Sequence, residues 1–131
     1  MTLVREAMVV EPRTLAADAS AQEAGVLLAK PDVRAVFVCA DDRLVGVVTR
    51  KTLVREVVAP GRDPRSTPLG EIAEKPHYTI DAEMQADEAF RFMEEKDAER
   101  VPVVEDEKLV GVLARVVLQR RLAEDEPPQD D

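Results

Sequence analysis

Aromatic residues are scarce in this sequence, which has no tryptophan, one tyrosine and three phenylalanines among 131 residues. With so few aromatic side chains, the chain has little surface on which bases or sugars could stack. Its formal net charge of −9 argues against nucleic-acid binding, which depends on attraction to phosphates. No apolar run approaches the roughly 18 residues of a membrane-spanning helix. We therefore expect neither a nucleic acid nor a membrane as a partner.

Cysteine and histidine are also rare, with only Cys39 and His77. A single cysteine cannot form an internal disulfide, and the N-terminus does not resemble a secretory leader, so we expect a reducing, cytoplasmic location. One histidine and one distant cysteine fall short of the three or four ligands of a metal site. We assign no metal ligand, no required cofactor and no catalytic residue, because no nucleophile–base pair is recognisable. Cys39 is expected in the core and His77 in a loop.

The chain does contain a duplication. At an offset of 65 residues, positions 14–58 align with 79–123 without a gap, and sixteen of the 45 pairs are identical. Such self-similarity indicates two copies of one structural unit. Copies of this size are near the lower limit for independent folding, so we expect them to pack together. We predict repeat 1 over 1–58, a Pro- and Gly-containing linker over 59–68 without regular structure, repeat 2 over 69–123, and a disordered acidic tail over 124–131.

Both repeats show the same order of predicted elements. Ser20–Lys30 has helical spacing, with Ser20 and Glu23 placed for a capping box, and Gln85–Lys96 repeats that spacing. In each repeat, two β-branched runs joined by a polar turn then predict a hairpin. The four strands are Ala35–Ala40, Leu44–Val48, Arg100–Glu105 and Leu109–Leu113; second helices are expected at Arg50–Val58 and Arg115–Ala123, and short opening strands at Thr14–Ala16 and Thr79–Asp81. The sequence therefore predicts an α+β or α/β fold of two tandem β-α-β-β-α repeats.

This duplication resembles the cystathionine-β-synthase (CBS) domain pair. The matching features are Ala7-Met8 and Pro12 before the opening strand, the Gly46–Thr49 strand end and the strand Arg100–Val104. The resemblance covers residues 3 to about 123. It implies two repeats packed about a pseudo-twofold axis, with a cleft in each half that can hold an adenine nucleotide or related adenosyl ligand. It also implies that two chains associate as a homodimer, a flat disc of four repeats.

In repeat 1, the resemblance implies a ligand site at the end of the second hairpin strand. The family pattern Gly-x-x-Thr/Ser-x-x-Asp places a hydroxyl at the phosphate and a carboxylate at the ribose. Here Gly46 and Thr49 match this pattern, but Thr52 replaces the aspartate, which should weaken ribose binding. The residues implied for the repeat 1 cleft are Thr14, Val36, Thr49, Arg50, Lys51 and Thr52. The alternative for Thr49 is a helix cap without a ligand.

In repeat 2, the corresponding site is degraded, because Ala114 and Val117 occupy the two polar positions of the pattern. The residues that remain for this cleft are Thr79, Arg100, Val101 and Arg115. Arg100 has a surface ion pair as its alternative role, and Arg115 has a solvated helix start.

The leading hypothesis is a non-enzymatic regulatory or sensor module that binds AMP, ATP, S-adenosylmethionine or an NAD-type ligand and acts on a regulated protein that the sequence does not identify. The alternative is a structural or dimerisation scaffold whose ligand sites have decayed. An enzyme is the least favoured reading, because no reactive constellation is present.

Overall fold

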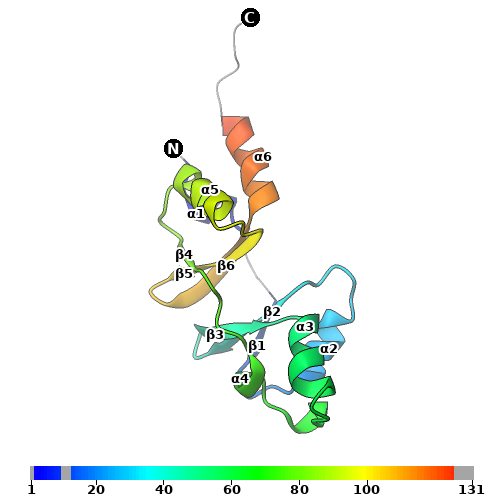
Figure 1. The fold of residues 1–131 in the computed structure, drawn as a ribbon. Helices are drawn as coiled ribbons and strands as arrows, with labels where there is room; N and C mark the ends of the chain where they lie inside the picture. The colour runs from blue at the N-terminus through cyan, green and yellow to red at the C-terminus, as the bar shows by residue number, and fades with distance from the viewer. Residues whose placement is uncertain (1, 10–12, 126–131) are drawn as a thin grey trace, which may run out of the picture. The chain divides into compact units, whose positions relative to one another are not determined.

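The computed structural model describes residues 2–9 and 13–125, and the duplication is visible in its elements (Figure 1). Repeat 1 contains β1 (Thr14–Ala16), α2 (Ala21–Leu28), β2 (Val36–Ala40), β3 (Arg43–Val48), α3 (Arg50–Leu53) and a π-helix, η1 (Val54–Val58). Repeat 2 contains β4 (Ile80–Asp81), α5 (Ala86–Glu95), β5 (Arg100–Glu105), β6 (Lys108–Ala114) and α6 (Arg115–Asp125). The predicted β-α-β-β-α order and mixed α/β class are confirmed.

The three strands of each repeat pair in the same register. β1 runs parallel to β2, with Thr14 opposite Phe37, and β2 runs antiparallel to β3, with Val36 opposite Val48. In repeat 2, β4 is parallel to β5 and β5 is antiparallel to β6, with Arg100 opposite Ala114. The hairpins turn through residues with positive φ, at Asp41–Asp42 and at 106–107. The short acidic side chains of aspartate tolerate this left-handed conformation better than most residues do.

The predicted capping box of the first helix is present. The Ser20 hydroxyl accepts from the Glu23 amide at 3.2 Å, and the Glu23 carboxylate accepts from the Ser20 amide at 2.8 Å. Two N-terminal amides of α2 are thereby satisfied. In α5, Gln85 makes no equivalent side-chain cap bond.

Two further short helices precede the opening strands, α1 (Val4–Ala7) and α4 (Leu69–Ile72), and each packs with the other repeat. Of the described residues, 13–77 form one unit, whereas 2–9 join 78–125 in the second. The segments that contain α1 and α4 make equivalent backbone hydrogen bonds, at positions that differ by 65 residues. Leu69 N donates to Ala19 O at 2.8 Å, and Val4 N donates to Met84 O at 2.9 Å. The repeats of the sequence and the compact units of the structure thus divide the chain at different places.

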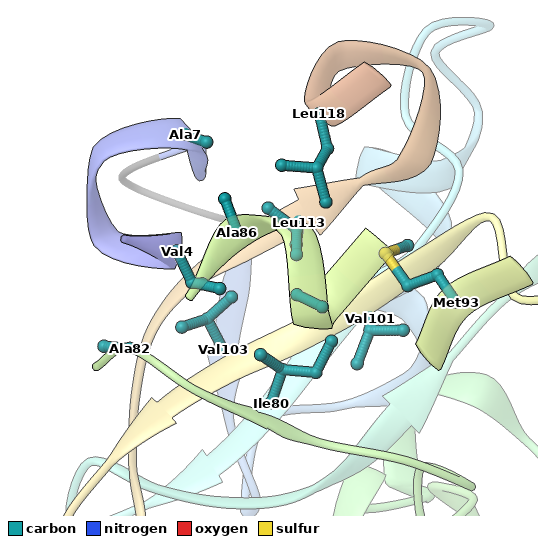
Figure 2. Packing of buried hydrophobic residues seen from close by; sticks show 11 residues of the cluster. Val4, Ala7, Ile80, Ala82, Ala86, Met93, Val101, Val103, Leu113 and Leu118 are labelled. Atoms are coloured by element: carbon teal, nitrogen blue, oxygen red, sulfur yellow. The ribbon is translucent and has the colours of Figure 1, made fainter. Parts of the chain in front are cut away.

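We call the segments that contain α1 and α4 the exchanged segments, because each packs with the other repeat. Each of them contributes to the core of the unit that it joins. Leu69 is fully buried and Ile72 is 4% exposed among residues of repeat 1, and Val4 and Ala7 are buried among residues of repeat 2. Figure 2 shows Val4 directed towards Val103 of β5, within this second cluster. Arg5 also donates to Glu83 and Glu105, and these bonds raise the pKa of its guanidinium. The exchanged segments are therefore integral parts of both cores.

The exchange explains why a glycine occupies the centre of both second hairpin strands. The segment after α4 bonds across β3, where Val47 and Glu74 exchange two backbone hydrogen bonds of 2.8 and 3.0 Å. A Cβ atom on Gly46 would lie 2.7 Å from the carbonyl oxygen of Glu74. On Gly111, it would lie 2.8 Å from the carbonyl oxygen of Val9. Only a residue without a side chain leaves room for the crossing backbone.

The segments outside the repeats differ from expectation. The predicted linker contains a short 3-10 helix, η2 (Pro64–Ser66), capped by Asp63, so the prediction that it lacks regular structure was wrong. Thr67 after it is buried and donates to Asp63 O at 2.8 Å. Glu124 and Asp125, predicted as the start of the disordered tail, are the last residues of α6. The rest of that tail and Pro12 lie outside the described residues.

Among the helices of residues 2–9 and 13–125, none combines the length and the hydropathy needed to cross a bilayer.

Candidate functional site

The strand registers bring the predicted residues of repeat 1 to one edge of its sheet. Thr14 begins β1, Val36 begins β2, and Thr49 directly follows the end of β3. Because Thr14 lies opposite Phe37 and Val36 lies opposite Val48, the three positions are neighbours. Thr14 is exposed, Thr49 is half-buried, and Val36 is fully buried, so Val36 can reach this edge only through its backbone.

Thr49 caps the helix that starts at this edge. Its hydroxyl accepts from Thr52 N at 3.3 Å, and Thr52 Oγ1 accepts from Thr49 N at 3.0 Å. The two hydroxyl oxygens are 3.1 Å apart. Thr52 is only 1% exposed, so its side chain completes the cap from inside the protein. Thr49 stands at the edge itself, while Thr52, at the ribose position of the family pattern, faces the interior.

Arg50 has two backbone partners within repeat 1. Its Nη2 atom donates to the carbonyl oxygens of Lys30 and Val33, both at 2.8 Å. These carbonyls belong to the turn that follows α2, so Arg50 ties the end of the first helix to the start of the second. Its counterpart Arg115 lies 3.5 Å from Asp97 in the equivalent turn of repeat 2. The identical arginines therefore share a place in the fold. Lys51, two residues after Thr49, is exposed as Arg50 is.

Replacing Arg50 by alanine is expected to lower the free energy of unfolding by about 1.5–3 kcal/mol, because hydrogen bonds from a charged donor are lost. Arg50→Lys should restore only part of this stability, since an ammonium group lacks the planar fork that bridges two acceptors. Urea denaturation without any ligand measures the effect. Lys51→Ala is the matched control, and an equal loss of stability in both variants would contradict this role for Arg50.

Two further bases at this edge were missed by sequence analysis. Arg13 directly precedes Thr14, and its carbonyl accepts from Phe37 N at 2.8 Å. Arg34 lies two residues before Val36, and both arginines are exposed. Neither occupies a position of the family pattern. The register of β1 with β2 brings the starts of these two strands together, and with them the arginines that precede each strand. We call Arg13, Arg34 and Lys51 the basic edge of repeat 1.

The equivalent edge of repeat 2 has the same backbone arrangement but different chemistry. Thr79 is exposed just before β4, Arg100 is exposed at the start of β5, and Val101 is buried. Arg115 follows β6 directly, and its amide donates to Glu99 O at 2.9 Å. The positions matching the basic edge of repeat 1 hold Tyr78, Glu99 and Val116. Ala114 replaces the hydroxyl of Thr49, so the repeat 2 edge offers less to an anion.

The remaining candidates do not form a reactive group. Cys39, in β2, is partly buried, and burial, followed by the charge of Asp42, raises the pKa of its thiol. A raised pKa keeps the thiol protonated and weakly nucleophilic. His77 is exposed just before Tyr78. Across 2–9 and 13–125, no group of three or more His, Cys, Asp or Glu side chains lies close enough together to hold a metal ion.

Comparison with known proteins decides the family. The CBS domain model matches this chain twice, over residues 4–59 and 69–123. The chain belongs to the CBS domain family. It contains a tandem pair of CBS domains.

Individual proteins of known name or structure are also similar to this chain. Hypoxic response protein 1 of Mycobacterium tuberculosis is 36% identical over 94 residues, which cover 71% of this chain and 66% of that protein. A crystal structure of hypoxic response protein I with two coordinated zinc ions has a TM-score of 0.78 at 30% identity, covering 92% of this chain and 99% of that one. A protein with CBS domains from Burkholderia ambifaria has a TM-score of 0.65 at 23% identity, covering 92% of this chain and 89% of that one, and supports the fold alone.

Proposed function

We propose that this CBS pair is a regulatory module that binds a phosphorylated adenosyl ligand at the repeat 1 edge. The observation that carries the proposal is the basic edge itself, where three exposed bases lie beside Thr14 and Thr49. Exposed guanidinium and ammonium groups bind phosphate through charged hydrogen bonds. The Thr49 hydroxyl accepts from Thr52 N, and when Thr52 donates in the bond between the two hydroxyls, Thr49 has its proton to donate to a phosphate oxygen.

The ligand set that we propose differs from the one that the family pattern implies. It consists of Thr14, Thr49 and the basic edge, with the backbone at Val36 beside the base. Arg50 and Thr52 support the site from behind, because their polar atoms already bond within repeat 1. The ribose then loses a charged acceptor, so we expect phosphate contacts to dominate the affinity.

We also propose that two copies of the chain form a homodimer. A regulated protein would bind the ligand-bound form of this homodimer differently from the ligand-free form. A ligand can drive such a switch only if it binds one arrangement of the module more tightly than the other. The basic edge would bind a ligand differently in the two arrangements if the change between them moved charged groups near its three bases.

Thermal unfolding of the full chain with AMP, ATP or NADH tests the ligand proposal, and S-adenosylmethionine, which has no phosphate, is the comparison that should give a smaller shift. A ligand present at a hundred times its dissociation constant should stabilise the chain by about 2.7 kcal/mol. The variant Arg34→Glu places in repeat 1 the glutamate that repeat 2 has at the equivalent position, Glu99. It should abolish most of the ligand-induced rise in melting temperature. Arg100→Glu at the repeat 2 edge is the control and should retain the shift. If none of AMP, ATP and NADH raises the melting temperature, the ligand proposal is wrong.

The second candidate function is a scaffold without a ligand, favoured by the internal bonds of Arg50 and Thr52 and by the altered repeat 2 edge. In that case Thr49→Ala costs only a helix cap, about 1 kcal/mol, and leaves assembly unchanged. If Thr49 binds a ligand, the same variant should also weaken the thermal shift beyond the loss of basal stability. Melting curves with and without ligand separate the two effects.

A further inference from the structure

Arg55 of η1 lies between two carboxylates in repeat 1. Its guanidinium pairs with Glu56, the next residue of the helix, at 3.2 Å, and with Glu74 of the exchanged segment that crosses β3. Glu74 is held at this place by the two backbone hydrogen bonds that it exchanges with Val47. Repeat 1 and its exchanged segment therefore supply both acidic partners of this arginine within one compact unit.

Arg120 has the same place in repeat 2 but neither of these carboxylates. At the 65-residue offset, Arg121 and Val9 stand where the two glutamates stand in repeat 1. Val9 exchanges two backbone hydrogen bonds of 2.8 and 3.0 Å with Val112 of β6, so this exchanged segment crosses its strand in the same way. Among the described residues, no carboxylate forms an ion pair with Arg120. Arg120 is exposed and keeps neither acidic partner of its counterpart.

Two exposed valines lie beside this arginine. Val116 precedes Arg120 by four residues, on the same side of α6, and is 66% exposed. Leu118 lies two residues from both, on the opposite side, and Figure 2 shows it directed towards Leu113 in the core. Val9 is 48% exposed at the place that the pairing glutamate has in repeat 1. We call Val9, Val116 and Arg120 the Arg120 surface.

The exposure of valines does not by itself distinguish the Arg120 surface. Valines are also exposed elsewhere on the second helices of the repeats, at Val54, Val58 and Val117. Single exposed apolar residues are ordinary on protein surfaces. The Arg120 surface differs because its apolar positions are charged in repeat 1, where Lys51 matches Val116 and a glutamate matches Val9. One place in the fold is thus charged and internally paired in repeat 1, but apolar around an arginine in repeat 2.

This combination fits an acidic segment of another protein. A guanidinium binds a carboxylate through two parallel, charged hydrogen bonds. The pair of Arg55 with Glu74 shows that a carboxylate at the crossing segment reaches an arginine at this helical position. Aliphatic side chains next to the carboxylate would cover Val9 and Val116 and remove their apolar area from water.

We propose that the Arg120 surface binds a segment of another protein in which a glutamate or aspartate lies between aliphatic residues. The carboxylate of this segment takes the position at Arg120 that Glu74 has at Arg55. The inference rests on the regulated protein of the proposed function and gives the surface that binds it. It does not depend on whether a ligand binds the basic edge.

Fluorescence anisotropy with the full chain and a synthetic peptide tests this inference. The probe is a fluorescein-labelled peptide of alternating leucine and glutamate, which should bind the wild-type chain. Arg120→Glu reverses the charge of the surface, and Val9→Glu places a carboxylate beside the arginine. Each variant should raise the dissociation constant of the peptide at least tenfold, about 1.4 kcal/mol. A peptide with glutamine in place of glutamate should bind the wild-type chain at least tenfold more weakly.

Two variants in repeat 1 are the controls for the peptide assay. Val54→Glu makes the same change as Val9→Glu on the helix of the other repeat, and it should leave the dissociation constant unchanged. Arg34→Glu removes a base of the basic edge, which could also attract an acidic peptide, and it should change the dissociation constant little. Binding that is lost in Arg34→Glu but kept in Arg120→Glu would overturn the inference, as would no binding to the wild-type chain. Circular dichroism verifies that the variants are folded.

Two further measurements on Arg120→Glu separate this inference from the other proposals. Its sedimentation coefficient should equal that of the wild-type chain. A lower coefficient would make the Arg120 surface a contact between copies of this chain, and the inference would be wrong. Its melting temperature should rise with AMP, ATP or NADH as much as that of the wild-type chain, so a failure of the ligand proposal is seen in melting curves and a failure of this inference in peptide binding.

Discussion

Replacing Leu69 by alanine is expected to lower the free energy of unfolding by about 2–5 kcal/mol and to loosen repeat 1, although Leu69 belongs to repeat 2 by sequence. Its side chain is fully buried in the cluster that contains Leu28 and Val36. The cavity left by the truncation would lie beside the helix and strands of repeat 1. The range reflects how far neighbouring side chains can collapse into the cavity.

Hydrogen exchange on the full chain can locate this effect. In Leu69→Ala, the amides of β2 and β3 should lose protection before those of β5 and β6, because local stability follows local packing. Val4→Ala is the mirror variant, since Val4 occupies the equivalent place in the core of repeat 2. It should deprotect β5 and β6 first. Val54→Ala, at a side chain that is 58% exposed, is the control and should change little.

The opposite order of exchange would contradict the crossed arrangement. If Leu69→Ala deprotected β5 and β6 first, each repeat would be packing with its own leading segment.

Most of the repeat architecture was predictable, because it depends on local patterns that occur twice. The capping box at Ser20 and Glu23 needs only the spacing of two side chains, and the structure has both of its hydrogen bonds. The hairpins combine β-branched runs with polar turns, and the turns begin with the same residue, Asp41 or Asp106, in the same left-handed conformation. Local chemistry of this kind survives in any tertiary context that buries the same face.

The exchanged segments were missed because they carry no periodicity. α1 and α4 have four residues each, which is too short for a helical pattern. A weak signal was nevertheless present, since Thr2 and Glu6 are identical to Thr67 and Glu71 at the same offset. An alignment extended to these residues would have found the segments. It could not have found which repeat each one joins, because that depends on packing between distant parts of the chain.

The candidate site was predictable only where it follows the family pattern. That pattern identifies Thr49 and spans Lys51, but it also spans Arg50, whose guanidinium donates to the carbonyls of Lys30 and Val33. It omits Arg13 and Arg34, which become neighbours of the site through the parallel pairing of β1 with β2. Strand register, and the choice of hydrogen-bond partners for a side chain, are set only when the chain folds, so the sequence pattern could not predict them.

Replacing Gly46 by alanine is expected to destabilise the protein by about 1–3 kcal/mol, an unusually large effect for a single added methyl group. The new Cβ would lie 2.7 Å from the carbonyl oxygen of Glu74 and 2.8 Å from the Cβ of Ala73. A backbone atom cannot rotate away as a side chain can, so the crossing segment must move. That movement strains the two hydrogen bonds between Val47 and Glu74 and the burial of Ile72.

The matched control is the same chemical change on α2 of the same repeat. Gly25→Ala places its Cβ 3.9 Å from Leu53 Cδ1, an ordinary contact, and replaces glycine within a helix. It should therefore stabilise the chain by about 0.5–1 kcal/mol. Urea denaturation of both variants measures two changes of opposite sign. If Gly46→Ala were neutral, the crossing segment would not be held against β3, because only that contact makes a methyl group costly there.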